Sequence, residues 1–137
     1  MYSTQIYATF KISKHIQELN IDNDLKSGNT ELVHKIASGH KIKSSKNNKE
    51  IYFYSFATKY CNWHNQEKYA IYDQFVKKTL LAYKKQFHFS EFKTTDLKDF
   101  EKFKSIILEF INFFKLTEYN LKEIDKFLWI YGKELNK

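Results

Sequence analysis

The chain contains no proline and only three glycines, Gly28, Gly39 and Gly132, among its 137 residues. Proline and glycine are the residues that most often interrupt regular structure, so uninterrupted helices can form along most of this chain. Apolar residues recur at three- and four-residue steps, which is the spacing of one face of an α-helix. A chain of this length suffices for one hydrophobic core. We therefore predict an all-α protein, with residues 1–137 forming a single compact domain of five or six helices in an irregular, orthogonal bundle.

Turn and cap residues divide the first part of the chain into short helices. The first predicted helix covers about Thr4 to Leu19 and ends at "NIDNDLKSGN", which is rich in Asn, Asp and Gly. Thr30 is the predicted N-cap of a short helix through Ser38, and Gly39 closes that helix. Residues 40–49, "HKIKSSKNNK", lack periodicity and predict a mobile loop. That loop is either a solvated connection or a segment that contacts phosphate.

The clearest helical pattern lies in the last third of the chain. Before it, two helices are predicted from about Ile51 to Trp63 and from about Asp73 to Lys85. The segment "TTDLKDFEKFKSIILEFINFFKL" then forms an apolar stripe, with Thr95 or Asp96 as its cap, from Leu97, Phe100, Phe103, Ile107, Phe110 and Phe114. A last helix is predicted to start at Asn120, with Glu123 at capping-box spacing. Its expected buried residues are Leu121, Ile124 and Leu128, with Trp129 as a further candidate.

The basic residues are 23 lysines without a single arginine, and the formal net charge is +7. This charge suits a polyanionic partner, and it equally suits a lysine coat that keeps the protein soluble. Without arginine there is no planar fork for guanine edges or phosphates. A nucleic-acid surface on this chain would therefore act through point charges, and its binding would weaken as salt increases.

The single cysteine and the hydropathy of the chain indicate its cellular compartment and whether it can bind a metal. Cys61 is the only cysteine, so no intramolecular disulfide can form and a reducing compartment is expected. The N-terminus lacks a signal-peptide pattern, and no segment reaches about 18 consecutive apolar residues. We expect a cytoplasmic protein without membrane contact. Cys61 and His64 have the spacing of metal ligands, but the other histidines show no paired spacing, so neither a metal nor another cofactor is predicted.

The stretch "SFATKYCNWHNQEKYAIYDQFV", residues 55–76, places a lysine on one predicted helix and an aspartate at the start of the next. This order resembles the catalytic segment of helix-hairpin-helix DNA glycosylases. The resemblance implies Lys59 as a nucleophile and Asp73 as its electrostatic partner, with DNA as the substrate. The family's glycine-rich hairpin turn has no counterpart in "IYFYSFAT", and Lys59 and Asp73 are 14 positions apart, fewer than is usual in the family. Across most of the chain, "SFATK", "IYD" and "EIDKFLWIYGK" are similar to short uncharacterised helical bacterial proteins.

The chemistry of this pair follows from its residue types. A neutral lysine amine can attack a sugar carbon and form an imine, while a carboxylate stabilises the cationic sugar. Asp73 can instead be a helix cap, Lys59 a surface lysine, and the two a structural ion pair.

The segments around this pair hold further candidate residues. Trp63, His64 and Tyr72 flank the predicted turn, where aromatic rings could contact a flipped base or pack in the core. Lys77 and Lys78 are candidate phosphate contacts. The sequence therefore supports a DNA-binding, glycosylase-like protein that acts on a base or an abasic site. It equally supports a noncatalytic protein-interaction module, accessory to a bacterial defence or toxin system.

Overall fold

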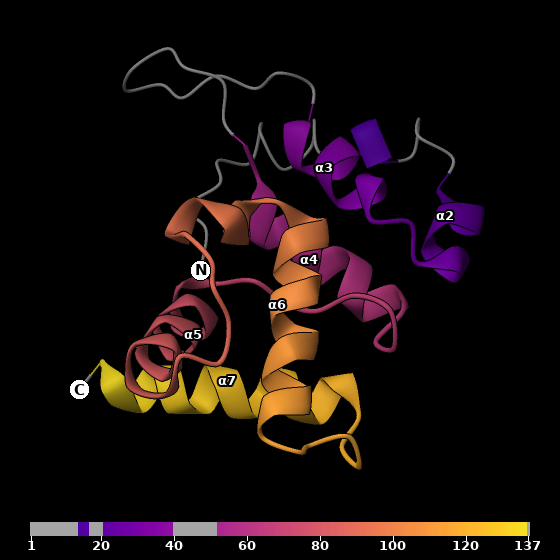
Figure 1. Cartoon of the computed structure of the whole chain (residues 1–137). Coiled ribbons are helices and arrows are strands. Elements are labelled where there is room, and N and C mark those ends of the chain that lie inside the picture. The colour runs from indigo at the N-terminus through magenta and orange to yellow at the C-terminus, as the bar shows by residue number, and fades with distance from the viewer. Residues whose placement is uncertain (1–13, 17–20, 40–51, 137) are drawn as a thin grey trace, which may run out of the picture.

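The computed structural model describes residues 14–16, 21–39 and 52–136, and helices are its regular structure within these ranges (Figure 1). In chain order they are α2 (Asp22–Ser27), α3 (Glu31–Ser38), α4 (Tyr54–His64), α5 (Gln74–Phe87), the 3₁₀ helix η1 (Thr94–Lys98), α6 (Phe100–Phe113) and α7 (Leu121–Leu135). The all-α prediction is confirmed. Residues 14–16 are helical, whereas the rest of the first predicted helix and the predicted loop 40–49 lie outside the described residues.

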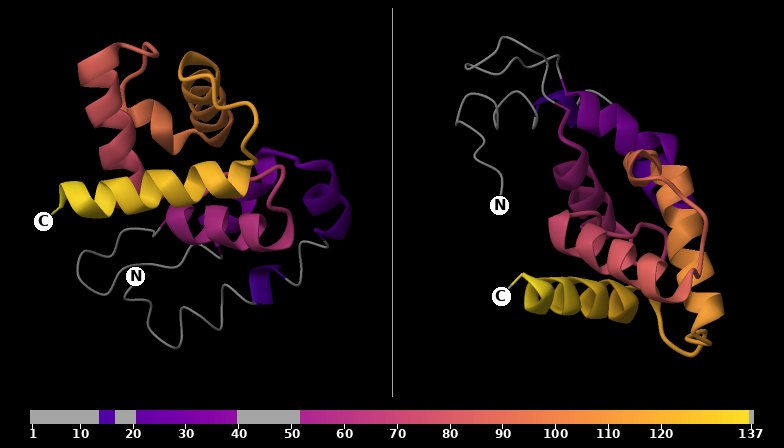
Figure 2. Two further views of the ribbon diagram at one scale, coloured as in Figure 1. Left: turned by 90° about the horizontal axis from the view of Figure 1, so that it is seen from below. Right: turned by 60° about the vertical axis from the view of Figure 1, so that its left-hand side comes forward.

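The helices pack at steep angles to one another. The most extensive pairings are α5 with α7 and α3 with α4, while α3 also contacts α6. Figure 1 shows α6 standing across α7. In the views of Figure 2, α2 and α3 lie at one end of the molecule, and α5 lies at the other end with the C-terminal part of α7. This is the irregular bundle that the sequence predicts.

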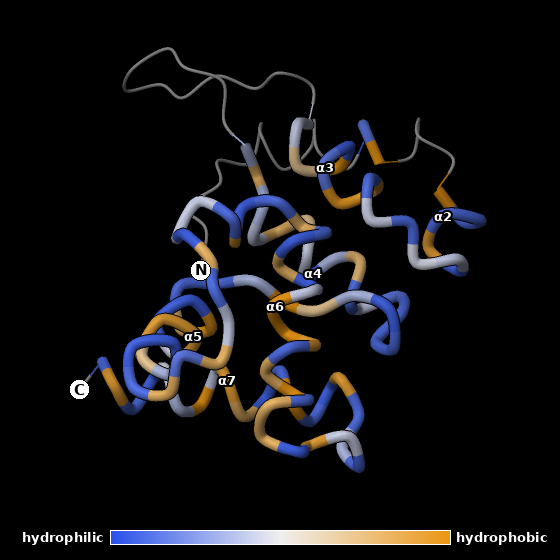
Figure 3. Tube along the Cα trace, viewed as in Figure 1, coloured by the Kyte–Doolittle hydropathy of each residue, from blue (hydrophilic) through white to orange (hydrophobic). Residues whose placement is uncertain are grey.

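The predicted aromatic stripe forms the centre of the core. Leu97, Phe100, Phe103, Ile107 and Phe110 are all buried, and they pack with the buried apolar residues of α3, α4 and α5. Figure 3 shows hydrophobic and hydrophilic residues alternating along α6 at helical spacing. Phe114 follows the last residue of α6 and is half-buried at the edge of the core.

Both predicted ends of α3 and the predicted start of α7 are confirmed, whereas the predicted cap of α6 is wrong. Thr30 and Gly39 flank α3, although no side-chain hydrogen bond is made by the Thr30 cap. Asn120 and Glu123 form the predicted capping box of α7. The cap of α6 is Asp99, and neither Thr95 nor Asp96 fills that position. The reason is that residues 94–98 form their own 3₁₀ turn, in which Asp96 accepts a hydrogen bond from the Lys93 amide.

A very close crossing joins α5 and α7. A Cβ atom on Gly132 would lie 2.0 Å from the carbonyl oxygen of Phe75, so only glycine fits there. Thr79 of α5 donates a hydrogen bond of 2.6 Å to the Leu128 carbonyl near the same crossing. The predicted burial of Trp129 is wrong, since 39% of this side chain is exposed beside the crossing.

Within the described part of the chain, the helices are too short or too polar to cross a bilayer.

Candidate functional site

The glycosylase-like motif spans α4, the junction of residues 65–73 and the start of α5. Thr58 and Asn62, one turn apart on α4, hold this segment. The Thr58 hydroxyl accepts a hydrogen bond of 3.0 Å from the Tyr72 amide. The Asn62 side chain donates one of 2.7 Å to the Tyr69 carbonyl. Because these bonds pair backbone groups that have no helical partner, the junction is held against α4 in one register.

Asp73 lies at the end of the junction and caps α5. One oxygen of its carboxylate accepts hydrogen bonds from the Phe75 and Val76 amides, at 3.0 and 2.9 Å. The side chain is only 8% exposed. This geometry stabilises the first turn of α5. The capping role that the sequence allowed for Asp73 is therefore present, and it leaves the second carboxylate oxygen for other contacts.

Lys59 follows Thr58 on α4, next to the junction, and its side chain is half-buried. Successive helix residues point about 100° apart, so Lys59 is directed away from the side on which Thr58 holds Tyr72. Lys59 therefore belongs to the outer side of α4.

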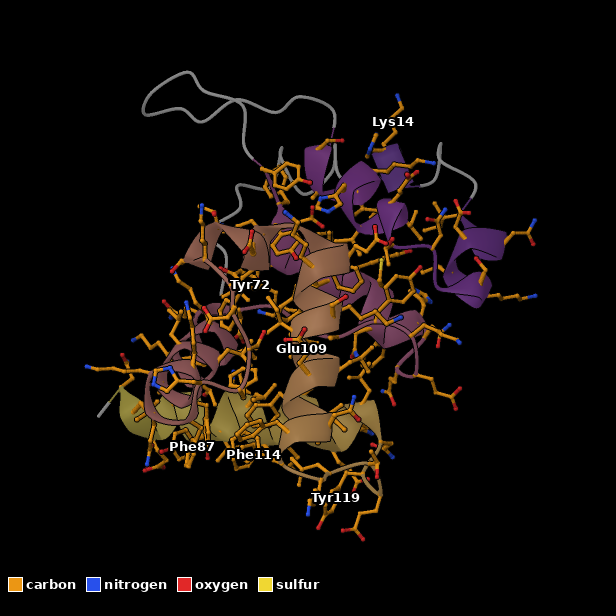
Figure 4. The ribbon with its side chains drawn as sticks, viewed as in Figure 1. Lys14, Tyr72, Phe87, Glu109, Phe114 and Tyr119 are labelled. Atoms are coloured by element: carbon orange, nitrogen blue, oxygen red, sulfur yellow. The ribbon has the colours of Figure 1, made fainter. Side chains whose placement is uncertain are left out.

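The three aromatic candidates of the motif divide between surface and core. Trp63 is 79% exposed on the outer side of α4. His64 is also exposed, and it lines a surface pocket together with Asp22, Leu25, Lys26 and Asn65. Tyr72 is buried against Tyr54 and Phe103, and Figure 4 shows it in the interior beside α6. A base could therefore reach Trp63 and His64, but not the ring of Tyr72.

Asp125 of α7 is a buried carboxyl at this junction that the sequence analysis did not single out. One of its oxygens accepts hydrogen bonds from the Ile71 amide at 3.3 Å and from Asn62 at 3.5 Å. The other oxygen is buried and has no hydrogen-bond partner among the described residues. Burial raises the pKa of Asp125 to about 8, the Ile71 amide opposes this rise, and the nearby Asp73 carboxylate adds to it. At neutral pH Asp125 therefore carries a proton.

Lysines form two rows near this junction. The four lysines of α5, Lys77, Lys78, Lys84 and Lys85, fall within about one third of the helix circumference. We call them the α5 lysine face, and α5 contains no aspartate or glutamate. On α7, Lys122, Lys126, Trp129 and Lys133 follow one another at steps of four, three and four residues. We call these four residues the α7 line.

Two contacts join α5 and α7 beside these rows. Lys78 donates a hydrogen bond to the Asn136 side chain, next to the end of α7. Phe75 packs edge-on against Trp129, with ring centroids 5.9 Å apart. Lys78 therefore lies at the C-terminal end of α7, and Phe75 brings α5 into contact with Trp129.

A cluster of aromatic rings is exposed elsewhere on the molecule, where α5, α6 and α7 come together. Phe87, Phe113 and Phe127 are each between 41% and 49% exposed. Phe87 and Phe113 both contact Phe114, and Phe127 contacts Tyr83. We call Phe87, Phe113 and Phe127 the aromatic patch, and Figure 4 shows Phe87 beside Phe114.

The remaining chemistry of the described residues is limited. Cys61 is fully buried, and burial raises the pKa of its thiol to about 12, so it is a core residue without nucleophilic character at neutral pH. No group of three His, Cys, Asp or Glu side chains in the described ranges is arranged to hold a metal ion.

A family model described as an N-terminal domain, HI_0787_N, matches residues 1–68. An uncharacterised protein of Haemophilus influenzae is 43% identical over 136 residues, which are 98% of this chain and 62% of that relative. The chain thus spans less than two thirds of the relative's length. No solved structure matches.

These matches agree with the predicted similarity to uncharacterised bacterial proteins. They give no support to the resemblance to helix-hairpin-helix DNA glycosylases. By these comparisons, the chain is similar to a longer bacterial protein whose activity is not known.

Proposed function

We propose that the protein binds DNA through the α5 lysine face. The observation that carries this proposal is the grouping of four lysines on one flank of a helix that has no acidic residue. Lys78 and Lys85 are exposed, and Lys77 and Lys84 are half-buried. The only carboxylate at the start of α5, Asp73, is buried and bonded to the backbone. The positive charge of this flank is therefore not neutralised by its own helix.

The mode of binding follows from the residue type. Lysine ammonium groups contact phosphates as point charges and release bound counterions from the DNA. Because the chain has no arginine, the bidentate contact that most often reads guanine is not available. Binding should therefore be nearly independent of sequence and strongly dependent on salt.

A salt titration with matched lysine variants tests this proposal. Fluorescence anisotropy would measure binding to a labelled DNA duplex for the wild type and for the double variant Lys77→Gln, Lys78→Gln. Each phosphate that the variant can no longer neutralise should reduce the slope of log affinity against log salt by about 0.9. The control is the double variant Lys26→Gln, Lys35→Gln, which removes the same charge from α2 and α3. Equal weakening by both variants would show that net charge alone is responsible, and the α5 face would lose its role.

The glycosylase-like part of this proposal concerns Lys59 and Asp73. It rests on the motif, in which Lys59 lies on α4 and Asp73 caps the next helix, α5. Borohydride trapping on duplex DNA with an abasic site tests it, because a lysine nucleophile would form a reducible imine there. A covalent adduct that disappears in Lys59→Gln would support lyase chemistry. If no adduct forms while the duplex is bound, the protein is a DNA-binding protein without this chemistry.

The aromatic patch favours a second candidate, a noncatalytic protein-interaction module. Exposed rings of this number on one surface are typical of protein contact sites. A two-hybrid screen would use Phe127→Ser to disrupt the patch and Trp63→Ser as the control at an exposed ring on α4. A partner that is lost with Phe127→Ser and retained with Trp63→Ser would support this function. If every partner still binds both variants, the aromatic patch is not the interaction site.

A further inference from the structure

The α7 line places an exposed tryptophan among three lysines. Lys122, Lys126 and Lys133 are all exposed, and Trp129 stands between the second and the third with 39% of its side chain exposed. At about 1.5 Å per residue the line is about 16 Å long, which is enough for a few nucleotides of an extended strand. The acidic residues of α7 are Glu123, Glu134 and the buried Asp125, and the helical spacing places them off this line.

The surroundings of Trp129 orient its indole ring. The edge-on contact with Phe75 supports it from α5. The Lys133 ammonium lies over the ring, 4.9 Å from its centroid. This lysine has a flexible side chain, so its ammonium can move from the ring to a phosphate while a base takes its place on the indole. Phe75 thus supports the indole edge-on, and the Lys133 ammonium lies over its face.

We propose that the α7 line binds single-stranded nucleic acid, with one base stacked on Trp129 and the backbone phosphates on the three lysines. This inference rests on the proposed function and adds the class of nucleic acid to it. Aromatic side chains stack on unpaired bases irrespective of base identity, whereas the bases of a duplex are already stacked on each other. A protein that binds only through phosphate contacts has no such preference. The line therefore predicts tighter binding of a single strand than of a duplex of equal length.

The test compares four proteins on two DNA molecules. Wild type, Trp129→Leu, Trp129→Phe and Trp63→Leu would be titrated with fluorescein-labelled oligo(dT) and with a duplex of the same length. Circular dichroism and thermal unfolding would show that each variant is folded. Trp63→Leu is the comparison variant, because it removes the other exposed indole, which lies on α4 and is the alternative stacking ring.

The expected result is specific to one variant and one ligand. Trp129→Leu should weaken oligo(dT) binding about 5- to 150-fold, which corresponds to the loss of one stacked base. Its duplex affinity should change less than about twofold, since phosphate contacts are retained. Trp129→Phe should keep most of the affinity for oligo(dT), and Trp63→Leu should keep all of it.

The outcomes separate this inference from the proposed function. If Trp129→Leu binds oligo(dT) as tightly as the wild type while the α5 lysine variant has lost duplex binding, stacking on Trp129 is overturned and DNA binding stands. If Trp63→Leu is the variant that loses oligo(dT), the stacking ring is on α4 and the inference is likewise overturned. If the wild type binds neither ligand at low salt, both proposals fail.

Discussion

Replacing Asp125 with asparagine should change how the stability of the protein depends on pH. The carboxyl group is 5% exposed, and the Ile71 amide and Asn62 hydrogen-bond to one of its oxygens. Its pKa is raised to about 8 in the folded protein, mainly by burial. In the unfolded chain the same group titrates near its ordinary value of 3.8. The folded state therefore binds one more proton than the unfolded state at pH values between these two.

The sign of the effect follows from this difference in bound protons. A group whose pKa is higher in the folded protein stabilises the fold in full when the pH is below the pKa of the unfolded chain. This stabilisation is lost as the pH rises toward the pKa of the folded protein. The loss is steepest at up to about 1.4 kcal/mol per pH unit. Between pH 6 and pH 8 it amounts to about 2 kcal/mol for a folded pKa near 8. Asparagine has a similar shape, cannot ionise and should abolish this slope.

Urea unfolding at pH 6 and at pH 8, followed by circular dichroism, measures the effect. The free energy of unfolding of Asp125→Asn, relative to the wild type, should improve by about 2 kcal/mol when the pH is raised. Asp22→Asn makes the same change at an exposed carboxylate, and its free energy of unfolding should change between pH 6 and pH 8 by as much as that of the wild type. If the free energy of unfolding of Asp125→Asn has the same pH dependence as that of the wild type, Asp125 is ionised in the folded protein and the reasoning from its burial is wrong.

Three further substitutions test packing and hydrogen bonding inside the helical bundle. Gly132→Ala should destabilise the fold by at least about 1 kcal/mol in chemical denaturation, because the clash with α5 exceeds the gain of about 1 kcal/mol in helix propensity; a stabilised variant would disprove the close crossing. Asp73→Ala should remove about 0.5–2 kcal/mol of stability because α5 would have no cap, and an unchanged unfolding midpoint would count against it. Tyr54→Phe should leave the unfolding temperature equal or higher, since the buried Tyr54 hydroxyl has no partner among the described residues; a clear decrease would reveal a hydrogen bond there.

The features that the sequence predicted correctly are local ones. The capping box of α7 needs only Asn120 and Glu123, three residues apart. The buried stripe of α6 needs only helical spacing, because any helix that carries so many phenylalanines on one side must bury that side. The cap of α6 was missed because "TTDLKD" contains several residues that can cap a helix. The sequence alone does not show that a 3₁₀ turn uses Asp96 and leaves α6 to Asp99.

The candidate sites depend on contacts between distant segments, so only the tertiary structure could reveal them. Asp125 meets Ile71 across 54 positions of the chain, and its raised pKa depends on that burial. Its place beside Ile124 on the apolar side of the last helix was a signal that the sequence offered. The exposure of Trp129 had no such signal. The crossing at Gly132 brings the backbones of α5 and α7 into contact, which leaves Trp129 beside the helix pair instead of between the helices. Residue spacing determined which side chains share a helix face, and the angle at which two helices cross decided which of those faces remained open to a partner.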